Sequence, residues 1–297
     1  MKTVLQTLES TIAPAQIRSW EALSDFQRTQ LTRSVSQPEQ IFWVSPSSIA
    51  ELSAIVACAD RNQWRILPCG HASKLHWGGT VDPVTLVIST ERINQLIEHA
   101  EGDLTVTAEA GISFAEMQST VGKVGQFCAI DPILSDRATL GGIIATADTG
   151  SLRHRYHSIR DMLLGITFVR SDGEIVKAGG RVVKNVAGYD LMKLLTGSYG
   201  TLGILAQATL RVYPIPPVSR SILLTGDPTS LAQAAQTLLS SALTPVSIDL
   251  ISSSITELLD LPKSLGLIVR FQSIAESVEQ QIDRFTEVAK MLNLEVS

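Results

Sequence analysis

Cysteine is scarce in this sequence, and its pattern excludes several kinds of site. The chain of 297 residues has three cysteines, Cys58, Cys69 and Cys128, which are widely spaced and outside any Cys-x-x-Cys pair. This pattern argues against a disulfide framework, a structural zinc site and an iron–sulfur cluster. His154 and His157 are the best candidates for metal ligands, but no third ligand follows at a suitable spacing. We therefore predict no metal site and place both histidines at the surface or facing a phosphate.

The common nucleotide-binding and hydrolase signatures are also missing. The chain contains no Gly-x-Gly, so the nicotinamide-binding Rossmann motif is absent, as are the phosphate-loop and Gly-x-Ser-x-Gly motifs. There is no basic block, and the formal net charge is -5, which argues against a nucleic-acid partner. No window approaches the ~18 unbroken apolar residues that cross a bilayer. We expect no direct membrane span and a cytoplasmic protein, with any membrane association made through partner subunits.

The composition and length indicate two globular lobes. Apolar residues make up 44% of the chain and charged residues 18%, which is enough for a packed core. A proline cluster, Tyr213 to Pro217, marks a boundary, so we predict three parts: 1–37, a helical segment; 38–216, a large domain; and 217–297, a smaller one. In the first part Val4, Leu5, Leu8 and Ile12 have helical spacing. That stripe favours a helix docked on its own domain over a helix that binds a partner.

The last part reads as an unfinished α+β unit. Its pattern is strand (221–224), helix (229–239), strand (246–251), strand (265–271) and helix (277–292), which is most of a βαββαβ unit of ferredoxin-like type. The sequence stops at 294–297, where a closing strand would begin. We therefore expect an incomplete cap domain and a chain that is a truncation of a longer protein.

The large domain begins with alternating strands and helices and contains a loop of small residues. After a strand at Phe42, Ser48 and Glu51 predict a capping box that opens a helix. The next strand, 64–67, ends in Pro-Cys-Gly-His-Ala-Ser-Lys-Leu-His-Trp-Gly-Gly, residues 68–79. A diphosphate needs several backbone N–H groups turned toward one point, which suits the small residues at 69–74. An ordinary surface turn is the alternative for this loop alone.

Two further glycine-rich stretches follow. The first is Asp131-Pro132 together with 139–146, Thr-Leu-Gly-Gly-Ile-Ile-Ala-Thr. The second runs from Lys184-Asn185-Val186-Ala187-Gly188-Tyr189-Asp190 through a short helix to 197–204, Gly-Ser-Tyr-Gly-Thr-Leu-Gly-Ile. Each stretch alone is a weak signal, but the order and spacing of all three loops together are specific.

Together these segments resemble the FAD-binding domain of the vanillyl-alcohol-oxidase or p-cresol-methylhydroxylase (PCMH) family. The resemblance covers 38–216 and is strongest to the branch that oxidises 2-hydroxy acids, through 160–165, Arg-Asp-Met-Leu-Leu-Gly. Within that branch 68–70 with 74–79, and 184–190, are most similar to the E subunits of cyanobacterial glycolate oxidases. The resemblance implies an α+β, two-lobed FAD-binding fold of the PCMH type with the smaller, incomplete ferredoxin-like cap.

The same resemblance implies where non-covalent FAD would bind. The first loop would hold the pyrophosphate, the second stretch would line the adenine, ribityl and flavin side, and the last turn would contact the flavin through its backbone. The implied cofactor residues are Cys69, Gly70, His71, Ala72, Ser73, Lys74, Asp131, Pro132, Thr139, Gly141, Gly142, Ala145, Thr146, Gly200, Gly203 and Ile204. His71, Ala72 and His157 depart from the small residues or glycine usual in the family. Some relatives attach flavin to a histidine in the first loop, but Ser73 rather than His71 aligns with that position.

The implied activity is that of a subunit. The resemblance implies an FAD-dependent oxidoreductase acting on CH–OH donors, which oxidises a small 2-hydroxy acid, glycolate to glyoxylate, together with a larger flavoprotein subunit and an iron–sulfur subunit. Relatives place their substrate-binding arginines and proton acceptors in the cap, so no residue here is assigned as catalytic. Two alternatives remain open: a stand-alone flavin oxidase or dehydrogenase of another hydroxylated substrate, and a flavin-fold scaffold without catalysis.

Overall fold

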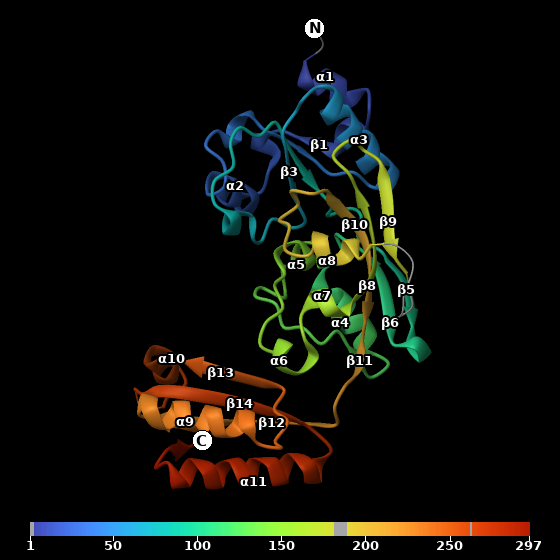
Figure 1. Cartoon of the computed structure of the whole chain (residues 1–297). Coiled ribbons are helices and arrows are strands. Elements are labelled where there is room, and N and C mark those ends of the chain that lie inside the picture. Colours follow the sequence, from blue (N-terminus) through green and yellow to red (C-terminus); the bar gives the residue numbers. More distant parts are fainter. Residues whose placement is uncertain (1–2, 181–188, 262) are drawn as a thin grey trace. The chain divides into compact units, whose positions relative to one another are not determined.

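The computed structural model describes residues 3–180, 189–261 and 263–297 and divides into two compact units (Figure 1). Unit 1 consists of Met1–Cys128, Pro132–Asp148 and Ser158–Tyr213, and unit 2 of Ala129–Asp131, Thr149–His157 and Pro214–Ser297. Both units contain helices and strands, as the predicted α+β class requires. The predicted domain boundaries at 37/38 and 216/217 stay a prediction. No helix in these described ranges is long and apolar enough to cross a membrane.

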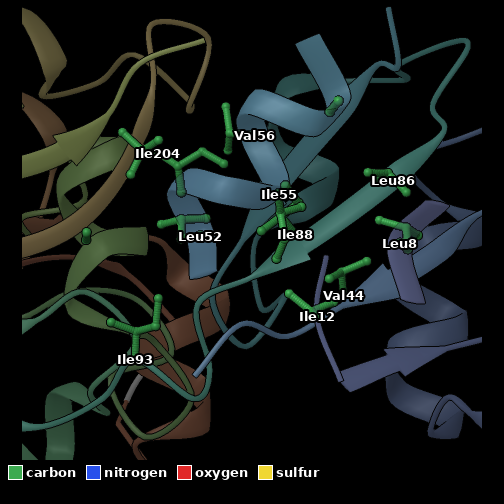
Figure 2. Close-up of a cluster of buried hydrophobic side chains, with 13 residues drawn as sticks. Leu8, Ile12, Val44, Leu52, Ile55, Val56, Leu86, Ile88, Ile93 and Ile204 are labelled. Carbon is green, nitrogen blue, oxygen red and sulfur yellow. The ribbon is translucent and has the colours of Figure 1, made fainter. Parts of the chain in front are cut away.

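The first sheet of unit 1 includes the strand that the 69–74 loop follows. Its strand order is β1 (Ile17–Arg18), β2 (Phe42–Val44), β4 (Leu86–Ser89) and β3 (Ile66–Cys69). The strands β2 and β3 pair in parallel with β4, so both reach the same edge of the sheet. Helix α3 (Ile49–Arg61) connects β2 to β3 and buries its apolar side in the core, which Figure 2 shows as a cluster that includes Leu52, Ile55 and Ile88.

Three residues of the N-terminal stripe, Val4, Leu8 and Ile12, pack on their own unit as expected, while Leu5 is exposed. Helix α1 (Val4–Glu9) starts at the capping residue Thr3, and Leu8 is fully buried. Leu8 and Ile12 join the same core cluster as Leu52 and Ile88 (Figure 2). The burial of these apolar side chains explains why the stripe faces inward rather than outward to a partner.

Half of the capping box expected at the start of α3 forms. The Ser48 side chain accepts a hydrogen bond from the Glu51 N–H at 3.2 Å. The Glu51 carboxylate does not return to Ser48; it accepts from the Ser47 N–H and from the Gln16 amide, both at 2.7 Å. These bonds hold the pKa of the Glu51 carboxyl below its ordinary value, the Ser47 N–H contributing most. The carboxylate thus ties the N-terminal segment to α3.

The second sheet of unit 1 is antiparallel and supports the remaining site segments. Its order is β5 (Leu96–Ala100), β6 (Thr105–Glu109), β10 (Ile204–Arg211), β8 (Leu163–Val169) and β9 (Ile175–Gly179). Every residue of β8 is buried. The other elements of unit 1 are α2 (Asp25–Thr32), α4 (Phe114–Gly122), β7 (Gln126–Phe127), α5 (Leu140–Thr146), α7 (Ile159–Met162) and α8 (Leu191–Leu195). The two-residue β11 (Tyr213–Pro214) follows β10.

Unit 2 has the ferredoxin-like strand order that the sequence predicts. Its elements are β12 (Val218–Gly226), α9 (Pro228–Ser240), β13 (Ser247–Ile251), α10 (Ser253–Leu258), β14 (Leu265–Ser273), α11 (Ala275–Met291) and β15 (Glu295–Val296), with α6 (Arg153–Tyr156) added from upstream. The sheet is antiparallel with the order β13-β14-β12-β15. Helix α10 was not expected. The closing strand β15 is two residues long and pairs with β12.

The core of unit 2 lies between its sheet and the helices α9 and α11. Phe271 of β14 and Phe285 of α11 are both fully buried. Their ring centroids are 6.4 Å apart and the rings meet edge to face at 69°. Such an aromatic pair adds to the apolar burial that holds the helix to the sheet.

Candidate functional site

A cavity of about 290 Å³ in unit 1 is lined by three segments that are far apart in the sequence. The first is the loop that follows β3, the second is helix α5 with its capping residue Thr139, and the third is the turn 198–204 that leads into β10. The volume is close to the lower end of the roughly 300–1,000 Å³ that ligand sites occupy.

Fourteen of the sixteen residues predicted from the sequence line this one cavity: Cys69, Gly70, His71, Ala72, Ser73, Lys74, Thr139, Gly141, Gly142, Ala145, Thr146, Gly200, Gly203 and Ile204. Asp131 and Pro132 are not among the residues that line it. The structure thus brings the three predicted loops together, while the contact of each residue with a cofactor stays a prediction.

The loop after β3 offers a row of backbone donors. Among the described residues, none accepts a hydrogen bond from the N–H groups of His71, Ala72, Ser73 or Lys74. Ala72, Ser73 and Lys74 are nevertheless buried. Buried N–H groups almost always have a partner, and these donors beside the cavity have none among the described residues, so they are available to a ligand or to water. An anion with several oxygens, such as a diphosphate, satisfies such a row.

The shape of this loop depends on close packing at its first residue. The Gly70 carbonyl accepts from the Ser89 hydroxyl of β4 at 2.9 Å. A Cβ on Gly70 would lie only 2.0 Å from Thr139 Oγ1, so a glycine is required there. Two residues on, Ala72 has φ +61°, a left-handed conformation that turns the chain and that glycine adopts without strain.

Helix α5, itself one of the three segments, contacts the other two. Thr139 caps its first turn, because its side chain accepts from the Gly142 N–H at 3.2 Å. At its other end the Ala145 carbonyl accepts from the Tyr199 N–H at 2.9 Å, which ties the 198–204 turn to the helix. Gly200 has φ +75° and packs on Pro68, where a Cβ would approach Cγ to 2.4 Å. The cavity walls are therefore held by short backbone contacts that larger residues would break.

Lys74, the last residue of the 69–74 loop, forms a buried ion pair with Asp148. Lys74 Nζ lies 2.8 Å from Asp148 Oδ2, and the two side chains are only 4% and 5% exposed. The ammonium also lies 5.2 Å from the centre of the Trp77 ring. The point charge that the sequence assigns to a diphosphate is thus shared with a carboxylate. Asp148 was not predicted, since nothing in its local sequence marks it.

The Asp131 carboxylate has a structural use within unit 2. It accepts a hydrogen bond from the Leu152 N–H at 2.9 Å, and the Asp131 N–H donates to the Thr149 carbonyl at 3.0 Å. Burial raises the pKa of the Asp131 carboxyl, and the backbone N–H groups of Leu152 and Ser151 oppose that rise. These bonds fix the turn before α6; the predicted cofactor contact of Asp131 stays a prediction.

Reactive groups are few in the described part of the cavity. Cys69 lines it, but burial raises the pKa of its thiol, so it remains protonated. Burial likewise raises the pKa of Cys128 to about 12. Among the residues described, no cluster of three potential metal ligands is present. The predicted motif at Lys184 to Gly188 lies outside the described residues.

Sequence reasoning missed several residues that line the cavity. Thr90, directly after β4, is one, and Val81 is another; neither lies in a recognisable motif. Ser198, Tyr199 and Thr201 also line it. These three residues lie in the 197–204 stretch, and their hydroxyl groups are the sequence feature from which they could have been predicted.

Known proteins show the same domain in sequence. Residues 41–179 match the family model described as "FAD binding domain". The chain is 26% identical over 295 residues to glycolate oxidase subunit GlcD of Bacillus subtilis, covering 96% of this chain and 60% of that protein. It is 34% identical over 154 residues to subunit GlcE of Escherichia coli, covering 52% and 43%. It is 35% identical over 188 residues to a mitochondrial D-lactate dehydrogenase [cytochrome] of Arabidopsis thaliana, covering 62% and 32%.

Solved structures show the same fold. Alkyldihydroxyacetonephosphate synthase superposes with a TM-score of 0.81 at 20% identity, covering 99% of this chain and 60% of that one. For p-cresol methylhydroxylase the TM-score is 0.74 at 14% identity, covering 99% and 65%. The chain thus spans less than two thirds of these relatives. A row of free N–H groups beside a cavity walled by glycines fits the diphosphate of FAD. Residues 41–179 are therefore similar to an FAD binding domain, in a chain that has the fold of alkyldihydroxyacetonephosphate synthase and p-cresol methylhydroxylase.

Proposed function

We propose that this chain is the FAD-carrying part of an oxidoreductase that oxidises a small 2-hydroxy acid, with glycolate as the preferred substrate. The observation that carries the proposal is that the three loops line one cavity, where the N–H groups at 71–74 have no acceptor among the described residues. The relatives named as glycolate oxidase subunits support the choice of substrate.

The chain's own residues would bind and orient the cofactor. The 71–74 N–H groups and the Ser73 hydroxyl would donate to the diphosphate, while the glycines at 141, 142, 200 and 203 would let the cavity walls pack closely on the rest of unit 1. The cavity volume suits the central part of a dinucleotide. When bound, FAD would accept the hydride that leaves the α-carbon of the substrate. We assign no residue as the base that removes the hydroxyl proton.

Partner subunits are part of the proposal. The names GlcD and GlcE denote subunits of a glycolate oxidase, so we propose that this chain works with a larger flavoprotein subunit and an iron–sulfur subunit. The three cysteines of the chain are spread over 58, 69 and 128. An iron–sulfur cluster would therefore be held by a partner.

Another substrate is the second candidate. The relatives also include D-lactate dehydrogenases and D-2-hydroxyglutarate dehydrogenases, and one of these is 32% identical to this chain over 187 residues. A stand-alone dehydrogenase for one of these acids would use the same cofactor cavity. A scaffold that binds FAD without catalysis is the third candidate.

Anaerobic addition of substrate distinguishes the three. The protein is purified with any subunits that co-purify, loaded with FAD, and mixed separately with glycolate, D-lactate and D-2-hydroxyglutarate while the visible flavin absorbance is followed. We expect glycolate to bleach the flavin of the complex but not of the isolated chain. Bleaching of the isolated chain by another acid would favour the second candidate, and no bleaching under any condition would favour the scaffold.

A further inference from the structure

The buried pair Lys74–Asp148 has an unusual place, because it joins the end of the candidate cofactor loop to the end of α5. Lys74 is the last residue of 71–74, whose N–H groups have no acceptor in the described part of the chain. Asp148 follows the last turn of α5, where its own N–H donates to the Ile143 carbonyl at 3.1 Å. The loop is thus fixed to α5 at both ends: by the Gly70–Thr139 contact at the start and by this ion pair at the end.

Asp148 uses both oxygens of its carboxylate as acceptors. Oδ2 accepts from the Lys74 ammonium at 2.8 Å, and Oδ1 accepts from the Ile133 N–H at 3.3 Å. The carboxylate therefore holds the segment that precedes α5 as well as the loop beside it. An asparagine at this position has one acceptor oxygen, so it cannot keep both bonds.

The electrostatics of the pair argue against a simple counter-charge. A lysine that serves only to attract phosphate is better left unpaired, because a carboxylate at 2.8 Å cancels most of its field. Burying both charges also costs desolvation, and an apolar pair would avoid that cost. Buried ionic groups of this kind are best explained when they fix one geometry.

We propose that Asp148 is a positioning residue of the cofactor site. It acts through Lys74 to hold the 71–74 N–H groups in the arrangement in which they donate to a diphosphate. The inference rests on the proposed binding of FAD by this loop. Asp148 does not line the cavity among the described residues, so its effect is indirect. The Lys74 ammonium lies on the side of the loop that faces Asp148 and Trp77.

The test is the affinity of the Asp148→Asn variant for FAD and for ADP, a diphosphate without flavin. Both are titrated into the apoprotein, and thermal unfolding is recorded in parallel. Removal of a negative charge should tighten anion binding if Lys74 is only a counter-charge. We expect the opposite: both ligands bind about tenfold more weakly, as a displaced binding geometry predicts. Affinity for either ligand equal to or tighter than that of the wild type would overturn the inference.

A second variant separates positioning from a loss of stability. Asp148→Asn leaves a buried ammonium short of a partner and lowers the melting temperature, whereas Lys74→Met combined with Asp148→Asn removes both charges and should restore most of it. We expect the double variant to recover its melting temperature but not its affinity for FAD and ADP. Recovery of both the melting temperature and the ligand affinity to wild-type values would overturn the inference. The double variant gives this test even if the single variant does not fold.

The matched control is Glu257→Gln, which breaks the exposed ion pair between Lys263 and Glu257 in unit 2. We expect wild-type affinity and melting temperature. A wild-type chain that binds neither FAD nor ADP would contradict the proposed function itself and remove the basis of the inference. Failure of the inference alone looks different: the wild type binds FAD and ADP, and the Asp148→Asn variant binds them equally well.

Discussion

Replacement of Gly70 by alanine is expected to weaken FAD binding about a hundredfold, because displacement of a binding group by ~1 Å has effects of that order. The added Cβ would lie 2.0 Å from Thr139 Oγ1 and 2.8 Å from its Cγ2, so either the loop or the capping residue of α5 must move. A shift of the loop moves the N–H groups at 71–74 away from their common point. Titration of the apoprotein with FAD, followed by flavin fluorescence, measures the change.

Gly122→Ala is the matched control for this variant. A Cβ on Gly122 meets no atom within 4 Å, and the residue is the last of helix α4, outside the residues that line the cavity. We expect its FAD affinity to equal that of the wild type. If Gly70→Ala binds FAD within about threefold of the control, which is less than 1 kcal/mol, the packing of the loop on α5 does not govern the site.

Truncation of Phe285 to alanine is expected to destabilise unit 2 by about 3–5 kcal/mol, the usual cost of removing a buried phenylalanine. The ring is fully buried and meets Phe271 edge to face, so its loss leaves a cavity between α11 and the sheet. Urea unfolding followed by far-ultraviolet circular dichroism measures the loss.

Met291→Ala, at the end of the same helix, is the control for that measurement. Met291 is 74% exposed, so we expect a change within about 0.5 kcal/mol. If the two variants unfold at the same urea concentration, the aromatic pair does not hold the unit together.

The place of the 69–74 loop at a cavity could be predicted from the sequence because the chemistry of a candidate diphosphate loop is local. Small residues after a strand, together with a hydroxyl and a lysine, are what a diphosphate needs, and the structure places the loop at a cavity with its N–H groups free. The departures from the family pattern are informative in the same way. Ala72 and His157 both adopt positive φ, +61° and +66°, where glycine is the residue without strain.

Ion pairs between residues far apart in the sequence could not be predicted from local patterns. Lys74 and Asp148 are 74 positions apart, and no local pattern announces that one is the partner of the other. The same limit explains Ser113, which stands three residues before Glu116, the spacing of a capping box. Ser113 does start α4, but its side chain makes no capping bond, and its backbone bridges to Thr139. Tertiary contacts decided both positions.

Strands with mixed burial were missed for a related reason. β9 alternates between exposed and half-buried residues, and β5 has one exposed and four half-buried residues, so neither has the fully buried run of β8. In contrast, the order of unit 2 was predicted because its helices have strong apolar stripes. Helix α10 was missed because it is six residues long with a single buried residue, Thr256.

The most direct test of the account is a visible absorption spectrum of the purified protein, before precipitation with acid and of the supernatant after it. We expect a flavin spectrum before precipitation and free FAD in the supernatant after it, because we propose that the site binds FAD without a covalent bond. A colourless protein that takes up no added FAD would contradict the assignment of the cavity, and flavin that stays with the precipitate would contradict non-covalent binding.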